Sequence, residues 1–172
     1  PNVLHIQELV SQAEQEGRQA VIIGERHHPE VMGLASWCTH PLVFQTPQEV
    51  EDWLQSGAFD PETPVTVVAQ TTCIRELFES SCKIIKKQCT NAKIFDTICF
   101  ATRKRQAEAA EIAARADAMV VVGDRRSANT QHLAEICRQN CSRVLQIESA
   151  DELSTAEFAG CRVAGLTAGA ST

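Results

Sequence analysis

Short apolar runs alternate with longer amphipathic stretches along the whole chain. Residues 3–16 repeat apolar side chains at helical spacing and are followed by Gly17, which predicts a helix that ends there. Short, mainly apolar runs predict strands at 20–23, 42–44, 65–69, 92–95, 119–122, 144–146 and 162–166. Further helices are predicted at 46–53, 74–85 and 101–116, with a short helical start at 151–152. This alternation predicts an α/β fold with mostly parallel sheets.

The two halves of the chain follow one plan. Gly24-Glu25-Arg26 matches Gly123-Asp124-Arg125 at a shift of 99 positions, and residues 67–71 match residues 163–167 at a shift of 96. We therefore expect two similar tandem βα domains, 1–95 and 96–172, each with a small sheet flanked by helices on both faces. Ligands of such sheets bind beyond the carboxyl ends of the strands, so the residues that follow each strand carry the functional argument.

Composition excludes several classes of protein. Of the 172 residues 44% are hydrophobic and 22% are charged, which suits a packed core and argues against disorder. The net charge of −6 provides no broad basic face for nucleic acid. There is no apolar run of membrane-spanning length and no secretory signal, so we expect a cytoplasmic protein. The eight cysteines include no CxxC pair, and most are expected to be reduced core residues.

Polar residues that could bind a ligand or transfer protons follow the strands of the first half. Residues 24–30 place two histidines and two carboxylates in one predicted loop, where they can bind phosphate or move protons, although a solvated polar loop has the same composition. Gln70-Thr71-Thr72 follows the strand at 65–69, and its hydroxyls suit either a helix cap or a ligand.

The second half offers anion donors and a distinctive cysteine. Residues 123–129 and 167–171 are small-residue loops at equivalent places, which together indicate a phosphate-bearing ligand. Cys99 lies between a strand and a helix start, where a thiolate is stabilised; it suits a metal ligand, a nucleophile or a half-buried structural thiol.

Five motifs occur together in the order and approximate spacing of one family. They are residues 27–33 (His-His-Pro-Glu-Val-Met-Gly), Gln70-Thr71-Thr72, residues 96–106 around Cys99, residues 122–129 and residues 167–171 (Thr-Ala-Gly-Ala-Ser). The chain resembles, over nearly its whole length, the 4-hydroxy-3-methylbut-2-enyl diphosphate reductases of the LytB type. Five separated motifs in register are far more specific than any one of them.

This resemblance implies a parent protein of three similar α/β domains around a central cavity. In the family a [4Fe–4S] cluster is held there by three cysteines, one from each domain, and two electrons remove the substrate hydroxyl as water to give isopentenyl and dimethylallyl diphosphate. The resemblance further implies an allylic diphosphate substrate and an electron donor such as ferredoxin or flavodoxin.

The family motifs assign roles to individual residues. Cys99 would be a cluster ligand, and Glu30 with Thr71 beside it would form the proton relay. The diphosphate would be held by His28, Thr72, Ser127, Asn129 and Ser171. Ala128 stands where many members have a second serine, so one diphosphate hydrogen bond would be absent.

The chain matches only the second and third domains of such a parent. Pro1 resembles the proline of a Cys-Pro motif whose cysteine precedes this sequence, and the family's helix after Ser171 is missing. One cysteine cannot hold a three-cysteine cluster, so we expect the isolated chain to carry an absent or incomplete cluster and to be inactive without the first domain. Two other functions stay open: a non-catalytic anion-binding or scaffold module that keeps the fold, and a redox-sensing thiol domain built on Cys99.

Overall fold

The computed structural model describes residues 3–57 and 59–169 of the chain. It divides into two compact units, Pro1–Cys99 and Phe100–Thr172. The sequence placed the division after residue 95, whereas the structure keeps the segment 96–99 with the first unit.

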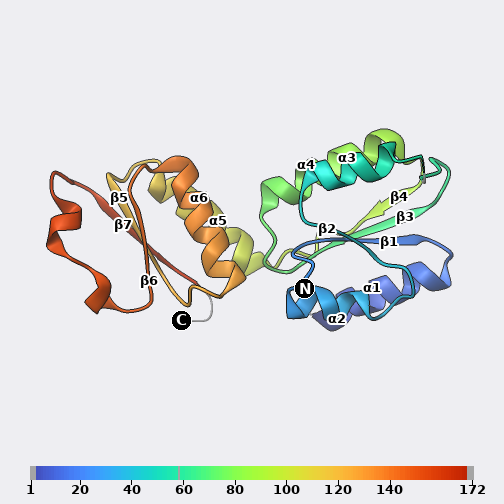
Figure 1. Ribbon diagram of the computed structural model, residues 1–172, viewed down its shortest axis with the longest axis horizontal. Coiled ribbons are helices and arrows are strands. Elements are labelled where there is room, and N and C mark those ends of the chain that lie inside the picture. Colours follow the sequence, from blue (N-terminus) through green and yellow to red (C-terminus); the bar gives the residue numbers. More distant parts are fainter. Residues whose placement is uncertain (1–2, 58, 170–172) are drawn as a thin grey trace. The chain divides into compact units, whose positions relative to one another are not determined.

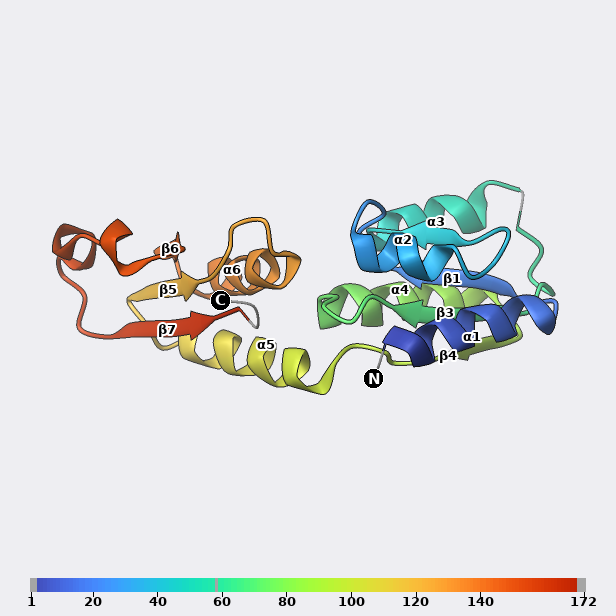
Figure 2. The ribbon, with the colours of Figure 1, turned by 90° about the horizontal axis from the view of Figure 1, so that it is seen from below.

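The first unit is a three-layer α/β sandwich (Figure 1). Its four parallel strands lie in the order β2-β1-β3-β4. Their bounds are β1 Gln19–Ile23, β2 Leu42–Phe44, β3 Val65–Ala69 and β4 Ala92–Ile94, and the helices are α1 Val3–Gln15, α2 Pro29–Ala35, α3 Pro47–Gln55 and α4 Arg75–Gln88. Helices α1 and α2 cover one face of the sheet, as Figure 2 shows, and α3 and α4 cover the other.

Alternating strand residues build two cores in this unit. Val21 and Val67 face α3 and α4 and pack with Phe78, while Ile22 packs with Ile6 of α1 on the opposite face. Both central strands are therefore buried on both faces, which explains why their sequences are apolar except for Gln19 and Thr66.

The second unit has three parallel strands in the order β6-β5-β7. Its elements are α5 Phe100–Ala113, β5 Ala118–Val122, α6 Ala128–Asn140, β6 Val144–Ile147, the 3₁₀ helices η1 Ala150–Glu152 and η2 Thr155–Phe158, and β7 Ala164–Ala168. No helix in the described parts of either unit is long and apolar enough to cross a bilayer.

Helices on both faces of the sheet were expected for this unit as well. The structure places its α-helices on one face only. Helices α5 and α6 lie side by side on one face (Figure 1), where Ala109 and Leu133 pack with Met119 and Val121. On β7 the side chain of Leu166 is 66% exposed. Between β6 and β7 the chain forms only 3₁₀ turns, where the first unit has the amphipathic helix α3 between β2 and β3.

The predicted duplication has a physical basis in two arginines. Arg26 donates to the carbonyl of Val43 (3.0 Å) and pairs with Glu49 (3.1 Å). Arg125 likewise donates to the carbonyl of Gln146 (3.3 Å) and pairs with Glu152. Each arginine ties the loop after the central strand to its neighbouring strand and to the next helix start, so the shared Gly-acid-Arg signature is structural.

Candidate functional site

The loops after β1 and β3 meet at the carboxyl edge of the first sheet. These strands pair in register up to Ile23 and Ala69. The buried side chain of Gln70 then joins the two loops, because its Oε1 accepts from the Glu25 N–H (3.0 Å) and its Nε2 donates to Thr72 Oγ1 (3.0 Å). No role could be assigned to Gln70 from the motif alone. In the structure its side chain links the two loops.

Gly24 is required by this link. A Cβ at position 24 would lie 2.7 Å from Gln70 Cβ and 2.8 Å from Gln70 Oε1, closer than side-chain atoms approach. We expect Gly24→Ala to lower the free energy of unfolding of the first unit by about 1–3 kcal/mol, as overpacking does. The measurement is urea unfolding followed by tryptophan fluorescence, because both tryptophans, Trp37 and Trp53, lie in this unit.

Gly33 of α2 provides the matched control. A Cβ there meets no atom within 4 Å, so Gly33→Ala should raise the free energy of unfolding by up to about 1 kcal/mol through helix propensity. Equal effects of the two substitutions would contradict the packing role of Gly24.

Helix α2 begins at the motif that the sequence placed in a loop. His28 is its N-cap, Pro29 occupies the first turn, and His28 Nδ1 accepts a hydrogen bond from the Glu30 N–H (3.2 Å). The loop interpretation of Pro29 and Glu30 is therefore wrong: proline pre-sets the first helical turn, and His28 serves as the cap. Since Nδ1 accepts, a neutral His28 ring carries its proton on Nε2 and can donate it to a ligand.

Glu30 is held by both polar groups of Thr71. Its Oε1 accepts from the Thr71 N–H and its Oε2 from Thr71 Oγ1, each at 2.7 Å. Both residues are half-buried. A carboxyl group and a hydroxyl at this distance can exchange a proton, and the backbone bond fixes their orientation.

Cys99 adjoins this pair. Its backbone N–H donates to the carbonyl of Thr71 (2.9 Å). Thr97 fixes the segment before it, because its Oγ1 accepts from the Ala69 N–H (2.7 Å) and donates to the Ala69 carbonyl (2.6 Å). Ile98 is fully buried, whereas Cys99 is half-buried and immediately precedes α5. Glu30, Thr71 and Cys99 therefore form one connected group at the sheet edge.

Cys99 suits one position of a metal centre, but the neighbouring residues do not complete such a centre. Within residues 3–57 and 59–169 no three His, Cys, Asp or Glu side chains gather closely enough to hold a metal ion. A half-buried thiol at a helix start, outside any disulfide, fits a single thiolate ligand.

The other thiols are mostly core residues, as expected. Burial raises the pKa of Cys73 to about 12 and that of Cys82 and Cys137 to about 11. Cys89 and Cys141 are also buried, and all eight cysteines, which lie in the described part of the chain, are free. Neutral buried thiols of this kind are poor nucleophiles and poor redox sensors.

The second unit presents unpaired polar atoms at the carboxyl edge of its sheet. Asn129 is 6% exposed and Thr130 is fully buried, and in the described structure neither amide atom of Asn129 nor the hydroxyl of Thr130 has a hydrogen-bond partner. Ser127 is the N-cap of α6, yet its side chain makes no capping bond. Buried polar groups are rarely left unpaired, so this edge is suited to a ligand with several acceptors.

The loop after β7 reaches the same edge. A Cβ at Gly169 would lie 2.4 Å from Thr130 Oγ1 and 3.7 Å from Asn129 Nδ2. The predicted donor Ser171 lies outside the described residues. The structure thus places His28, Glu30, Thr71, Thr72 and Cys99 at the edge of the first sheet, and Ser127 and Asn129 at the edge of the second.

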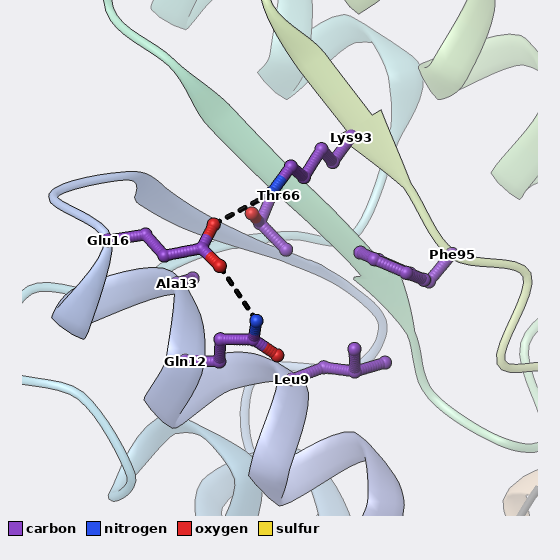
Figure 3. A pocket seen from close by; sticks show the side chains of 7 residues that line it. All are labelled: Leu9, Gln12, Ala13, Glu16, Thr66, Lys93 and Phe95. Atoms are coloured by element: carbon purple, nitrogen blue, oxygen red, sulfur yellow. Dashed lines mark hydrogen bonds and ion pairs between the residues drawn. The ribbon is translucent and has the colours of Figure 1, made fainter.

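A small pocket elsewhere in the first unit is structural. It lies between α1, β3 and β4 (Figure 3) and measures about 20 Å³, room for a single water. Glu16 bridges its walls by accepting from Gln12 Nε2 and Lys93 Nζ, each at 2.7 Å. The bond from Lys93 holds the pKa of Glu16 below its usual value.

Comparison with known proteins agrees with the motifs. The chain is 40% identical over 175 residues to a 4-hydroxy-3-methylbut-2-enyl diphosphate reductase of Anaeromyxobacter sp. (strain K); this match covers all of the chain but 60% of the relative. A solved structure of an (E)-4-hydroxy-3-methyl-but-2-enyl diphosphate reductase matches with 32% identity and a TM-score of 0.57, over 100% of this chain and 60% of that one. The reductase of Plasmodium falciparum shares the fold, with 22% identity and a TM-score of 0.90 over 99% of this chain and 53% of that one.

The chain thus spans about 60% of the length of the curated relatives it matches. The family model described as LytB protein matches residues 1–172, and the chain therefore belongs to the LytB family.

Proposed function

We propose that this chain forms the acid–base and diphosphate-binding part of a 4-hydroxy-3-methylbut-2-enyl diphosphate reductase. The observation that supports this most directly is the connected group of Glu30, Thr71 and Cys99, joined by three hydrogen bonds of 2.7 to 2.9 Å. A reductive dehydroxylation needs a proton donor beside its redox centre, and the named relatives are 4-hydroxy-3-methylbut-2-enyl diphosphate reductases.

The proposed reaction replaces a C–O bond by a C–H bond and consumes two electrons and two protons. One proton joins the departing oxygen to give water, and the other joins carbon. Glu30 supplies a proton through Thr71, whose hydroxyl lies 2.7 Å from its carboxyl group. The hydroxyl of Thr71 can donate to the substrate oxygen while it accepts from the protonated Glu30.

Diphosphate binding is assigned to the donors that the family motifs identify. These are His28 Nε2–H and the hydroxyl of Thr72 in one part of the motif set, and Ser127 and Asn129 in the other. The unpaired amide of Asn129 supports this assignment, because a phosphate oxygen would satisfy its buried N–H. Ser171 completes the set by its place in the motif.

Cys99 is assigned as one of the cysteines that hold a [4Fe–4S] cluster. When bound, the cluster would pass electrons from the external donor to the substrate, two for each turnover. Its remaining ligands would come from a further domain of the parent protein. The first unit contributes the thiol, half-buried and fixed through its own N–H and through Thr97. We assign the protein to the cytoplasm, with ferredoxin or flavodoxin as the electron source.

The experiment that tests this function compares the full gene product with the isolated 172-residue chain after anaerobic reconstitution. The full product should show an absorption shoulder near about 400 nm with about four irons per chain, and should reduce the allylic diphosphate. The isolated chain, folded by circular dichroism, should show neither. A full product that binds iron but leaves the diphosphate unreduced would favour the scaffold alternative.

A further inference from the structure

A second pocket, of about 240 Å³, opens beside α4 and β4 of the first unit. Its apolar floor consists of Phe78, Cys82 and Ile94. Lys83 and Lys86 line its rim, and both are exposed. None of the residues that line this pocket belongs to the relay or to the anion donors described above.

The pocket lining carries three cations and two carboxylates, a net charge of +1, although the chain as a whole is acidic. Arg75 at one end pairs with both carboxylates, Glu79 (2.9 Å) and Asp96 (2.7 Å). Lys83 and Lys86, by contrast, have no ion-pair or hydrogen-bond partner in the described structure, and Lys87 extends the row on the last turn of α4. Unpaired lysines around an apolar floor suit a partner that brings carboxylates and an apolar side chain together.

The pocket is connected to the segment that carries Cys99. Asp96 forms part of the pocket wall, and its Oδ1 accepts from the Ile98 N–H (3.3 Å). Three residues span at most about 11 Å even when fully extended, so the Asp96 end of the wall lies within that distance of the Cys99 backbone. Lys86 lies about 16 Å along α4 from Arg75, which pairs with Asp96, so a partner would have to cover the length of the pocket to contact both the lysines and the segment that carries Cys99.

We propose that this lysine-rimmed pocket is the docking surface for an acidic electron-carrier protein. The inference rests on the proposed function, because the reduction needs two external electrons. Each reduced carrier is oxidised by one electron, so two carriers serve each substrate, while the C–O bond breaks, a C–H bond forms and two protons are taken up. A small, charge-guided interface is typical of transient electron-transfer complexes.

The test uses the full gene product with Lys83→Glu and Lys86→Glu combined. Affinity for an acidic ferredoxin or flavodoxin should fall by about tenfold or more and lose most of its salt dependence. The rate with a small chemical reductant should stay within about twofold, because a small reductant needs no docking surface. The matched control combines Arg115→Glu and Arg138→Glu at exposed helix ends of the second unit, which changes the net charge equally.

Three outcomes would contradict the proposed docking surface. They are an unchanged affinity for the carrier, an equal loss of carrier affinity in the control variant, and an equal loss of rate with the small reductant. Lysine-dependent binding to anionic vesicles, with carrier binding unaffected, would overturn it too. If the unaltered product failed with the small reductant, the proposed function would fall, while the affinity measurement would still decide whether a carrier docks here.

Discussion

Cys99→Ser in the full gene product is expected to remove the cluster and to lower reductase activity by more than about a hundredfold. Iron–sulfur clusters are held by soft thiolates, and a serine hydroxyl at the same position is a much poorer ligand. The backbone contact between Cys99 and Thr71 does not depend on the side chain, so the fold should persist. Iron content, visible absorption and turnover are the measurements.

Cys161→Ser provides the control for this prediction. Cys161 is also half-buried and free, but it lies in the loop before β7 and accepts a hydrogen bond from Arg143 Nη1 (3.0 Å). Its replacement should leave iron content and turnover close to those of the unaltered protein. If Cys99→Ser retained about four irons and normal turnover, Cys99 would not be a cluster ligand and the reductase assignment would lose its main support.

The order of elements could be predicted because burial on both faces leaves a clear mark in the sequence. Val21 to Ile23 are all apolar, and Val65 to Ala69 are apolar apart from Thr66, since helices pack on each side of both strands. The start of α3 could also be predicted, because residues 46–49 have the sequence of a capping box. In the structure Thr46 Oγ1 accepts from the Glu49 N–H (3.2 Å), as that motif requires.

Other features depend on contacts between distant residues and leave no local mark. The helix α2 was missed because its cap is a histidine rather than serine, threonine or aspartate. The link made by Gln70 spans 45 residues to Glu25, and Thr97 completes the sheet by bonding to Ala69 beyond the end of β4. Neither contact follows from periodicity.

The site was only partly accessible from local chemistry. Strand-end position alone brought Glu30, Thr71 and Cys99 to one edge, as parallel sheets require. That Glu30 reaches across 41 residues to accept two bonds from Thr71 required coordinates. The burial of Asn129 without a hydrogen-bond partner could not be predicted either, because an asparagine near a helix start is usually exposed to solvent.

Glu30→Gln in the full gene product is expected to lower kcat by about 10²-fold or more while KM changes by less than a few-fold. The amide oxygen of glutamine can still accept from the Thr71 N–H, but its NH₂ group cannot accept from Thr71 Oγ1, and it carries no acidic proton. The relay is thus broken while the diphosphate donors stay in place. Steady-state kinetics with a small reductant, measured across pH, separates the two effects.

Glu25→Gln is the matched control, because Glu25 is the other carboxylate of the 24–30 segment, in the loop just before α2, and its contact with Gln70 is made by its backbone N–H. It should leave kcat within a few-fold. Thr71→Val should reproduce the loss seen in Glu30→Gln, and combining the two should add little, because residues that act as one unit are not additive. Near-normal turnover in Glu30→Gln, or a comparable loss in Glu25→Gln, would remove Glu30 from the proton path and leave its bonds to Thr71 with a purely structural role.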